Sequence, residues 1–383
     1  MSTNLQPSQI NIPTGFIDLG IGDPDFSLLP LALLRRSAKK RLAQTDSHFL
    51  QYGLEQGDPA LRHPLAGFLS HSYGFPVQPE NLFITSGISG GLDLICSLYT
   101  HTGDTIFVEE PSYFLALQIF RDHYLKIEPI PTDSDGLVIE ALEKKLAEVI
   151  PAFIYIIPTY QNPTGQTLSP ARREKLIALS RERRLLVLAD EVYHLLSYRG
   201  DPPRPLSSDP EARDVLSLGS FSKILAPGLR LGWIQAHTDH IRRLASSGLL
   251  ESGGGMNPFT SAIVGEVVTN GALEKNLAHL KATYGARVEA MAQHLKSHLP
   301  ELAYDIPQGG YFFWVRFPGG VDAEALLRLA EPYQVSFRPG PRFSSRGGMR
   351  DYARLSFSFY EPAETEEGLI RLRSCLENLR GVA

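Results

Sequence analysis

Cysteine is scarce in this 383-residue sequence. Only Cys96 and Cys375 occur, far apart in the chain and without Cys or His neighbours at metal-ligand spacing. The sequence therefore gives no indication of a disulfide framework or a zinc site, and it fits a reducing compartment.

Excess positive charge and long apolar runs are missing as well. Lys and Arg total 37 against 42 Asp and Glu, a formal net charge of -5, so no sequence-wide basic field exists to hold nucleic acid. No stretch approaches the roughly 18 apolar residues of a membrane-spanning helix, and residues 1–15 do not follow the pattern of a signal peptide. We expect a cytoplasmic protein with no nucleic-acid and no membrane partner.

The composition is that of a folded chain, with 43% apolar and 21% charged residues, and its length suggests two domains or one large core with an appendage. Short apolar runs alternate with helical patterns such as residues 171–184. Several of these runs are too continuously apolar for a half-exposed strand, which favours a mostly parallel sheet buried on both faces. The five runs are Asn81–Thr85, Thr105–Val108, Phe153–Ile157, Leu185–Ala189 and Val215–Leu218.

The C-terminal third has a different pattern. One long helix is predicted over Leu273–Leu299, and it is followed by three aromatic, glycine-punctuated strands. We therefore expect an α/β large domain over residues 46–272 and a smaller α+β domain formed by residues 1–45 together with residues 273–383. The three strands are predicted at Tyr311–Phe317, Val335–Arg338 and Arg354–Phe359.

Chemically useful residues follow the predicted strands. In open α/β sheets ligands bind beyond the carboxyl ends of the strands. Each residue also has a plain structural explanation: a tight turn, a packed ring, a solvated acid or a surface amine. In chain order the strands lead to a glycine-rich helix start at residues 85–91, Tyr113, Asn162, Asp190 with Tyr193, and Ser220 with Lys223 and Arg230.

Together these residues match one cofactor. A lysine can condense with an aldehyde, a carboxylate can pair with a ring nitrogen, and an aromatic side chain can stack on a planar ring. A helix N-terminus with a nearby arginine suits a phosphate. This combination predicts a pyridoxal 5'-phosphate site.

The motifs give a specific resemblance. The chain is similar, over nearly its whole length, to the fold-type I aminotransferases of class I/II, whose motifs it carries in the family's order. Gln161 and the segment 252–260 resemble the branch with the 2-aminoadipate and kynurenine aminotransferases. The motifs are residues 23–26 (Asp-Pro-Asp-Phe), 162–165 (Asn-Pro-Thr-Gly), 190–193 (Asp-Glu-Val-Tyr), 220–223 (Ser-Phe-Ser-Lys), 227–230 (Pro-Gly-Leu-Arg) and 354–357 (Arg-Leu-Ser-Phe).

The resemblance implies a role for each matched residue. Lys223 would form the internal aldimine and move the proton during transamination between an L-amino acid and a 2-oxo acid, through a pyridoxamine intermediate. Asp190 would keep the ring nitrogen protonated, Asn162 and Tyr193 would bind the ring oxygen, and Tyr113 would stack on the ring. The phosphate would be held by Ile88, Ser89, Ser220 and Arg230.

The substrate and the partner follow from the same resemblance. Arg354 would bind the substrate α-carboxylate, assisted by Asn162 and the backbone at Gly22. Tyr52 would reach the phosphate of a neighbouring subunit, which implies a homodimer with shared active sites. No metal is assigned by the motifs.

Two other functions stay open at this point. A β-elimination lyase on the same fold uses the same lysine, aspartate and arginine. A ligand-sensing regulator is the second alternative, although no basic helix-turn-helix segment precedes Gly22. No residue is assigned to a substrate side chain, and the glycines at 253–255 predict a mobile segment that admits varied side chains.

Overall fold

The main feature of the fold is an eight-stranded sheet. The computed structural model describes residues 10–382. All five predicted runs form strands of this sheet, and three strands that the sequence did not predict complete it. Its order is β2 (Leu82–Thr85), β9 (Gly232–Gln235), β8 (Val215–Ser220), β7 (Val187–Asp190), β6 (Ile154–Ile156), β3 (Thr105–Glu110), β4 (Lys126–Asp133) and β5 (Gly136–Leu137).

The strand directions bring five strand ends to one edge. The β3, β4, β6, β7 and β8 strands pair in parallel. The β9 strand runs antiparallel between β8 and β2, so β2 points in the same direction as β8. The segments that follow the five predicted strands therefore all begin at the same edge of the sheet.

Helices cover both faces of this sheet, because alternate side chains of each strand point to opposite faces. On one face Tyr155, Leu188 and Leu218 pack against α3, α4 and α7. On the other face Ile154 and Val187 pack against α5 and α6. These helices are α3 (Gly87–Tyr99), α4 (Phe114–Asp122), α5 (Ile139–Leu146), α6 (Pro170–Arg183) and α7 (Thr238–Ala245).

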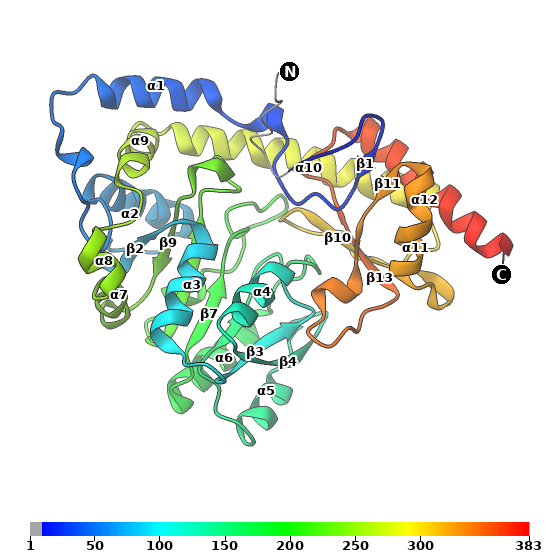
Figure 1. Cartoon of the computed structure of the whole chain (residues 1–383), viewed down its shortest axis with the longest axis horizontal. Helices are drawn as coiled ribbons and strands as arrows, with labels where there is room; N and C mark the ends of the chain where they lie inside the picture. Colours follow the sequence, from blue (N-terminus) through cyan, green and yellow to red (C-terminus); the bar gives the residue numbers. More distant parts are fainter. Residues whose placement is uncertain (1–9, 383) are drawn as a thin grey trace, which may run out of the picture.

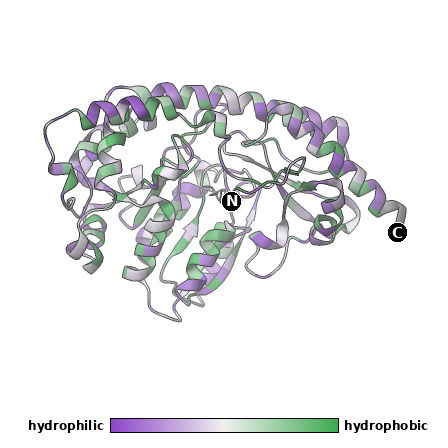
Figure 2. Ribbon diagram, turned by 45° about the horizontal axis from the view of Figure 1, so that its top comes forward, coloured by the Kyte–Doolittle hydropathy of each residue, from purple (hydrophilic) through white to green (hydrophobic). Residues whose placement is uncertain are grey.

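The C-terminal third of the chain begins with a long helix. The predicted long helix is confirmed as α10 (Ala272–His298), which Figure 1 shows running along one side of the molecule. Figure 2 shows hydrophobic and hydrophilic residues interspersed along the helices, as expected where one side of a helix packs on the core. The other α-helices, apart from α1, are α2 (Pro59–Tyr73), α8 (Gly248–Gly253), α9 (Pro258–Thr269), α11 (Ala323–Ala330) and α12 (Pro362–Val382).

One strand prediction in this region was wrong. Val335–Arg338 is not a single strand, because the chain changes pairing partner at the buried Phe337. Val335–Ser336 (β11) pairs with β1 (Ile17–Asp18), whereas Arg338–Pro339 (β12) pairs with β13. The β12 strand, β13 (Tyr352–Ser356) and β10 (Phe312–Arg316) form an antiparallel three-stranded sheet.

The N-terminal segment contacts both the C-terminal third of the chain, through β11, and the helix α9 that precedes α10. Its β1 strand pairs in parallel with β11, and α1 (Leu31–Leu42) packs on α9, where Lys40 forms an ion pair with Glu266 at 2.6 Å. Residues 1–9 of the predicted smaller domain lie outside the described residues. Among residues 10–382, none of the helices is both long and apolar enough to cross a membrane.

Candidate active site

Lys223 lies just beyond the carboxyl end of β8. Its Nζ donates a hydrogen bond to the Gly22 carbonyl oxygen at 2.7 Å and lies 3.6 Å from the Asp23 carboxylate. Burial lowers the pKa of this amine, because removing the ammonium from water disfavours the charged form. The amine is thus held at the end of a buried strand in contact with the N-terminal segment.

Asp190 is the last residue of β7 and is only 3% exposed. The Tyr155 hydroxyl donates to Asp190 Oδ2 at 2.7 Å, and the Val192 amide donates to Oδ1 at 3.2 Å. Burial raises the pKa of Asp190 to about 6, although both hydrogen bonds act to lower it. A cationic partner would stabilise this buried carboxylate, because it would offset the loss of solvation.

Arg354 on β13 is buried and holds Asn162 in place. Arg354 Nη1 donates to Asn162 Oδ1 at 2.9 Å, and Nη2 donates to the Gly20 carbonyl oxygen at 2.8 Å. The guanidinium carbon lies 3.9 Å from the centroid of the Phe312 ring, and burial lowers the pKa of Arg354 to about 10. Among residues 10–382, Arg354 Nε has no hydrogen-bond partner, so a buried donor remains free for an anion.

The start of α3 forms a second cationic region at the same edge of the sheet. Gly87 has a φ of +74°, and a Cβ there would lie 2.9 Å from Arg230 Nη2, so glycine allows the guanidinium to approach the helix end. Ile88 and Ser89 follow in the first turn, where backbone N–H groups have no partner within the helix. Ser220, at the end of β8, accepts a hydrogen bond from the Ser222 amide at 3.0 Å.

Two tyrosines lie among these charged groups. The charges of Arg354, Asp190 and Asp23 all act on the hydroxyls of Tyr113 and Tyr193. Burial raises the pKa of Tyr113 to about 12. The Tyr193 ring packs against Tyr311 and Phe312, with centroids 5.2 Å and 5.8 Å apart. Both phenols therefore stay protonated and can donate hydrogen bonds near neutral pH.

Tyr52 lies at the surface of this chain. Its side chain is 81% exposed, next to a bridge between Gly53 and Gly255. A Cβ at Gly255 would overlap the Leu54 carbonyl oxygen, so glycine at this position permits close packing of two backbone segments. The prediction of a mobile segment at 253–255 finds no support in this packing.

Sequence reasoning missed several residues of the site. Asp23 lies inside a motif that was recognised, but its ion pair with Lys223 depends on how the chain ends meet. Tyr155 was read only as part of an apolar run. Because Tyr155 pairs in register with Leu188, and Asp190 follows two residues later, alternation puts the tyrosine and the carboxylate on the same face.

Glu109 is a further buried acid near the site that the sequence did not single out. It accepts a hydrogen bond from the Ile157 amide at 2.8 Å, and burial raises its pKa to about 8. A protonated Glu109 adds no second negative charge beside Asp190. It thereby fixes the backbone at the end of β6 without competing for a cation.

These residues fit the polar groups of pyridoxal phosphate. The buried carboxylate of Asp190 suits a protonated ring nitrogen, and Lys223 suits the aldehyde. The free N–H groups of α3 and the Arg230 guanidinium suit a phosphate. The unpaired Arg354 Nε suits a carboxylate of the substrate.

Comparison with known proteins agrees with this geometry. The family described as "Aminotransferase class I and II" matches residues 14–372. The "Aromatic-amino-acid aminotransferase 1" of Thermococcus litoralis is 33% identical over 371 aligned residues, and the match covers 94% of this chain and 88% of that protein.

Solved structures give the same result. The kynurenine aminotransferase of Pyrococcus horikoshii, in complex with PMP, has a TM-score of 0.88 and 32% identity over 95% of this chain and 91% of its own. LysN, the α-aminoadipate aminotransferase of Thermus thermophilus, is complexed with N-(5'-phosphopyridoxyl)-L-leucine. It has a TM-score of 0.87 and 30% identity over 97% of this chain and 94% of its own. The large mixed sheet with its smaller companion sheet is thus the fold-type I architecture.

Proposed function

Since the chain belongs to the class I and II aminotransferase family, we propose that Lys223 is the residue that moves the proton in its reaction. The protein is a pyridoxal-phosphate-dependent aminotransferase that catalyses transamination between an L-amino acid and a 2-oxo acid. The bound cofactor supplies an electron sink for the electron pair left when the substrate α-proton is removed.

The largely buried amine of Lys223, whose side chain is 16% exposed, carries the proposal. Because burial lowers its pKa, a larger fraction of this amine is neutral near physiological pH than in a surface lysine. A neutral amine would accept the proton from the substrate α-carbon, and the resulting ammonium would deliver it to the C4' carbon of the cofactor and so become neutral again. The Gly22 carbonyl and the Asp23 carboxylate orient the amine and stabilise its charged form.

Asp190 is proposed to keep the cofactor ring nitrogen protonated. An ionised, buried carboxylate favours a cation beside it. Tyr155 fixes the orientation of this carboxylate and lowers its pKa through the 2.7 Å hydrogen bond. Tyr155 is thus a positioning residue, whereas Asp190 would contact the cofactor itself.

Substrate binding is assigned to Arg354 with Asn162 and Gly22. The guanidinium presents a buried and partly unpaired set of donors, which favours a carboxylate. Phe312 and Phe343, whose ring centroids lie 3.9 Å and 5.0 Å from the guanidinium carbon, exclude water and strengthen this interaction.

The cofactor phosphate is assigned to the start of α3. Ile88 and Ser89 would donate backbone N–H groups, Ser220 a hydroxyl and Arg230 its guanidinium. Tyr113 is proposed to stack on the ring and Tyr193 to bind the ring oxygen. The electrostatic proximity of both hydroxyls to Asp190 supports these two assignments.

Substitution of Lys223 by alanine tests the proposal. We expect the variant to fold and to bind the cofactor non-covalently, but to lose about 10²- to 10⁴-fold in kcat, the range typical of proton-transfer groups. The measurement is formation of the 2-oxo product from a panel of amino acids. Lys175→Ala is the matched control, because Lys175 forms an exposed ion pair with Glu140.

The outcomes separate the alternatives. Wild-type turnover in Lys223→Ala contradicts the role of this lysine. Release of pyruvate and ammonia without an acceptor 2-oxo acid would instead favour the elimination reaction on the same fold.

A homodimer with shared active sites is part of the proposal. An exposed tyrosine at position 52, beside the exposed Leu50 and Leu54, supports an apolar surface that a second copy covers. The two cysteines are free and buried, which supports the proposed cytoplasmic location.

A further inference from the structure

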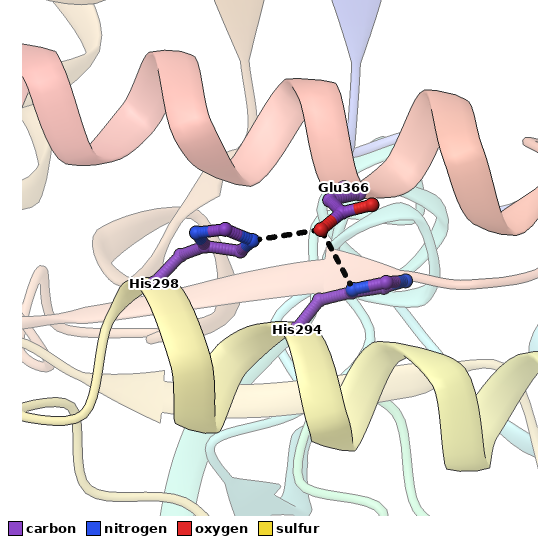
Figure 3. Close-up of side chains that lie close together, drawn as sticks. All are labelled: His294, His298 and Glu366. Atoms are coloured by element: carbon purple, nitrogen blue, oxygen red, sulfur yellow. Dashed lines mark hydrogen bonds and ion pairs between the residues drawn. The ribbon is translucent and has the colours of Figure 1, made fainter.

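Two histidines and a glutamate meet between α10 and α12, outside the residues assigned to catalysis. His294 and His298 are four residues apart on α10, so they lie on one helix face. Glu366 comes from the facing helix α12. Figure 3 shows both rings and the carboxylate pointing toward one another between the helices.

The three side chains are already close enough to share one ion. Glu366 Oε1 lies 2.9 Å from His298 Nε2 and 3.5 Å from His294 Nδ1. One ligand atom from each residue lies within 4.8 Å of the other two. Around a tetrahedral zinc ion with ligand bonds of about 2.0–2.1 Å, neighbouring ligand atoms are roughly 3.3–3.5 Å apart, so small side-chain rotations suffice.

We propose that His294, His298 and Glu366 form a binding site for a divalent transition-metal ion, with Zn²⁺ as the ion it takes and water as the fourth ligand. Imidazole nitrogens with one carboxylate oxygen are typical zinc ligands. Mg²⁺ and Ca²⁺ prefer sites made of oxygen ligands alone, so they bind poorly here.

The environment of the cluster suits reversible binding. The side chains of His294 and His298 are 19% and 21% exposed, so the rings are held by packing while an ion can still enter. The bound ion would replace two histidine contacts to one carboxylate and join α10 to α12.

Zinc titration of the full-length holoenzyme tests the site. The protein is prepared without a polyhistidine tag and is first treated with a chelator. It is then titrated with ZnCl₂, and binding is measured by calorimetry. We expect one Zn²⁺ per chain, a higher melting temperature with Zn²⁺, and no effect of Mg²⁺. His298→Ala and Glu366→Gln should weaken binding by about tenfold or more, because each removes one of three ligands.

A matched control separates the site from adventitious binding. His279→Ala removes an exposed histidine from the same helix and should leave zinc binding unchanged. Circular dichroism checks that each variant is folded, and if one ligand variant fails to fold the other carries the test. Equal zinc affinity in the wild type and a folded ligand variant, or no zinc binding by the wild type, overturns the proposal.

Discussion

At the scale of single residues, the candidate site is defined by charged groups that have lost most of their water. Asp190, Arg354 and Lys223 all have pKa values shifted toward the neutral form by burial. Each group is compensated by only a few hydrogen bonds from the protein. Bound molecules that bring the opposite charge therefore gain stabilisation here that they would not gain at the surface.

The pKa of Asp190 gives a prediction about cofactor binding. As the pH falls through about 6, Asp190 becomes protonated and no longer favours a protonated ring nitrogen, so cofactor affinity should fall. The Tyr155 hydrogen bond lowers this pKa. In Tyr155→Phe the pKa should therefore rise, and the loss of affinity should begin at a higher pH, with a loss of about tenfold in kcat at neutral pH.

Equilibrium binding of the cofactor, measured between pH 5 and pH 8, tests this effect. This range is suitable because a group titrates within about two pH units of its pKa. Tyr99→Phe is the control, because the Tyr99 hydroxyl contacts His240 and not the site. A pH profile in Tyr155→Phe that coincides with the wild-type profile would mean that Tyr155 has a packing role only.

At the scale of elements, the strand ends explain why the sequence could predict that several candidate site residues share one edge of the sheet. The runs that became β3, β6, β7 and β8 are buried on both faces, and continuous apolar runs indicate this directly. Because these strands are parallel, the residues after them meet at one edge. The apolar runs alone thus sufficed to place Asp190 and Lys223 at the same edge of the sheet.

Two of the strands that the sequence did not predict, β4 and β9, lack a long continuous apolar run. The β4 strand lies near the sheet edge, is mostly exposed or half-buried, and contains Pro129 and Pro131. The β9 strand has only four residues and begins at Gly232. Pairing, and not local preference, makes both segments strands. The contacts of Tyr155 and Gly20 were missed for the same reason, since they depend on register and on contacts between distant segments.

The helix start at Gly87 gives a prediction at the same scale. Gly87→Ala introduces a Cβ 2.9 Å from Arg230 Nη2 at a φ of +74°, so the guanidinium should move away from the start of α3. We expect cofactor affinity to fall by about tenfold, because one charge-assisted phosphate contact is weakened. Titration of the cofactor-free protein with pyridoxal phosphate measures this change.

Gly103→Ala is a matched control for this substitution. Gly103 has a φ of +89°, but a Cβ there would meet nothing within 4 Å. It therefore reports the cost of the backbone conformation alone. If both variants lose cofactor affinity equally, the effect of Gly87→Ala is general strain and not the displacement of Arg230.

At the scale of the whole molecule, distant segments of the chain build one site. Gly22 and Asp23 contact Lys223, and Gly20 contacts Arg354, so the N-terminal segment contacts candidate site residues at both the eight-stranded and the three-stranded sheet. The division into residues 46–272 and residues 1–45 with 273–383 stays a prediction. The packing of α1 on α9 means that the N-terminal segment contacts both of the predicted domains.

The proposed dimer predicts that two defective variants recover activity when their subunits are mixed. If Tyr52 serves the phosphate of the partner's cofactor, Tyr52→Phe should lower activity at limiting cofactor, and Lys223→Ala should lower it at any cofactor concentration. In a mixed dimer of the two variants, one site carries both defects and the other carries neither. By the symmetry of a two-fold dimer, a fully exchanged equal mixture should recover about a quarter of wild-type activity.

Activity after subunit exchange at limiting cofactor measures this recovery, and light scattering measures the oligomeric state. Tyr124→Phe is the control for Tyr52→Phe, because Tyr124 is also a highly exposed tyrosine, 74% against 81%. It should keep the wild-type affinity for the cofactor. A mixture no more active than the average of its two parents would mean that each chain completes its own site. The exposure of Tyr52 would then need another explanation.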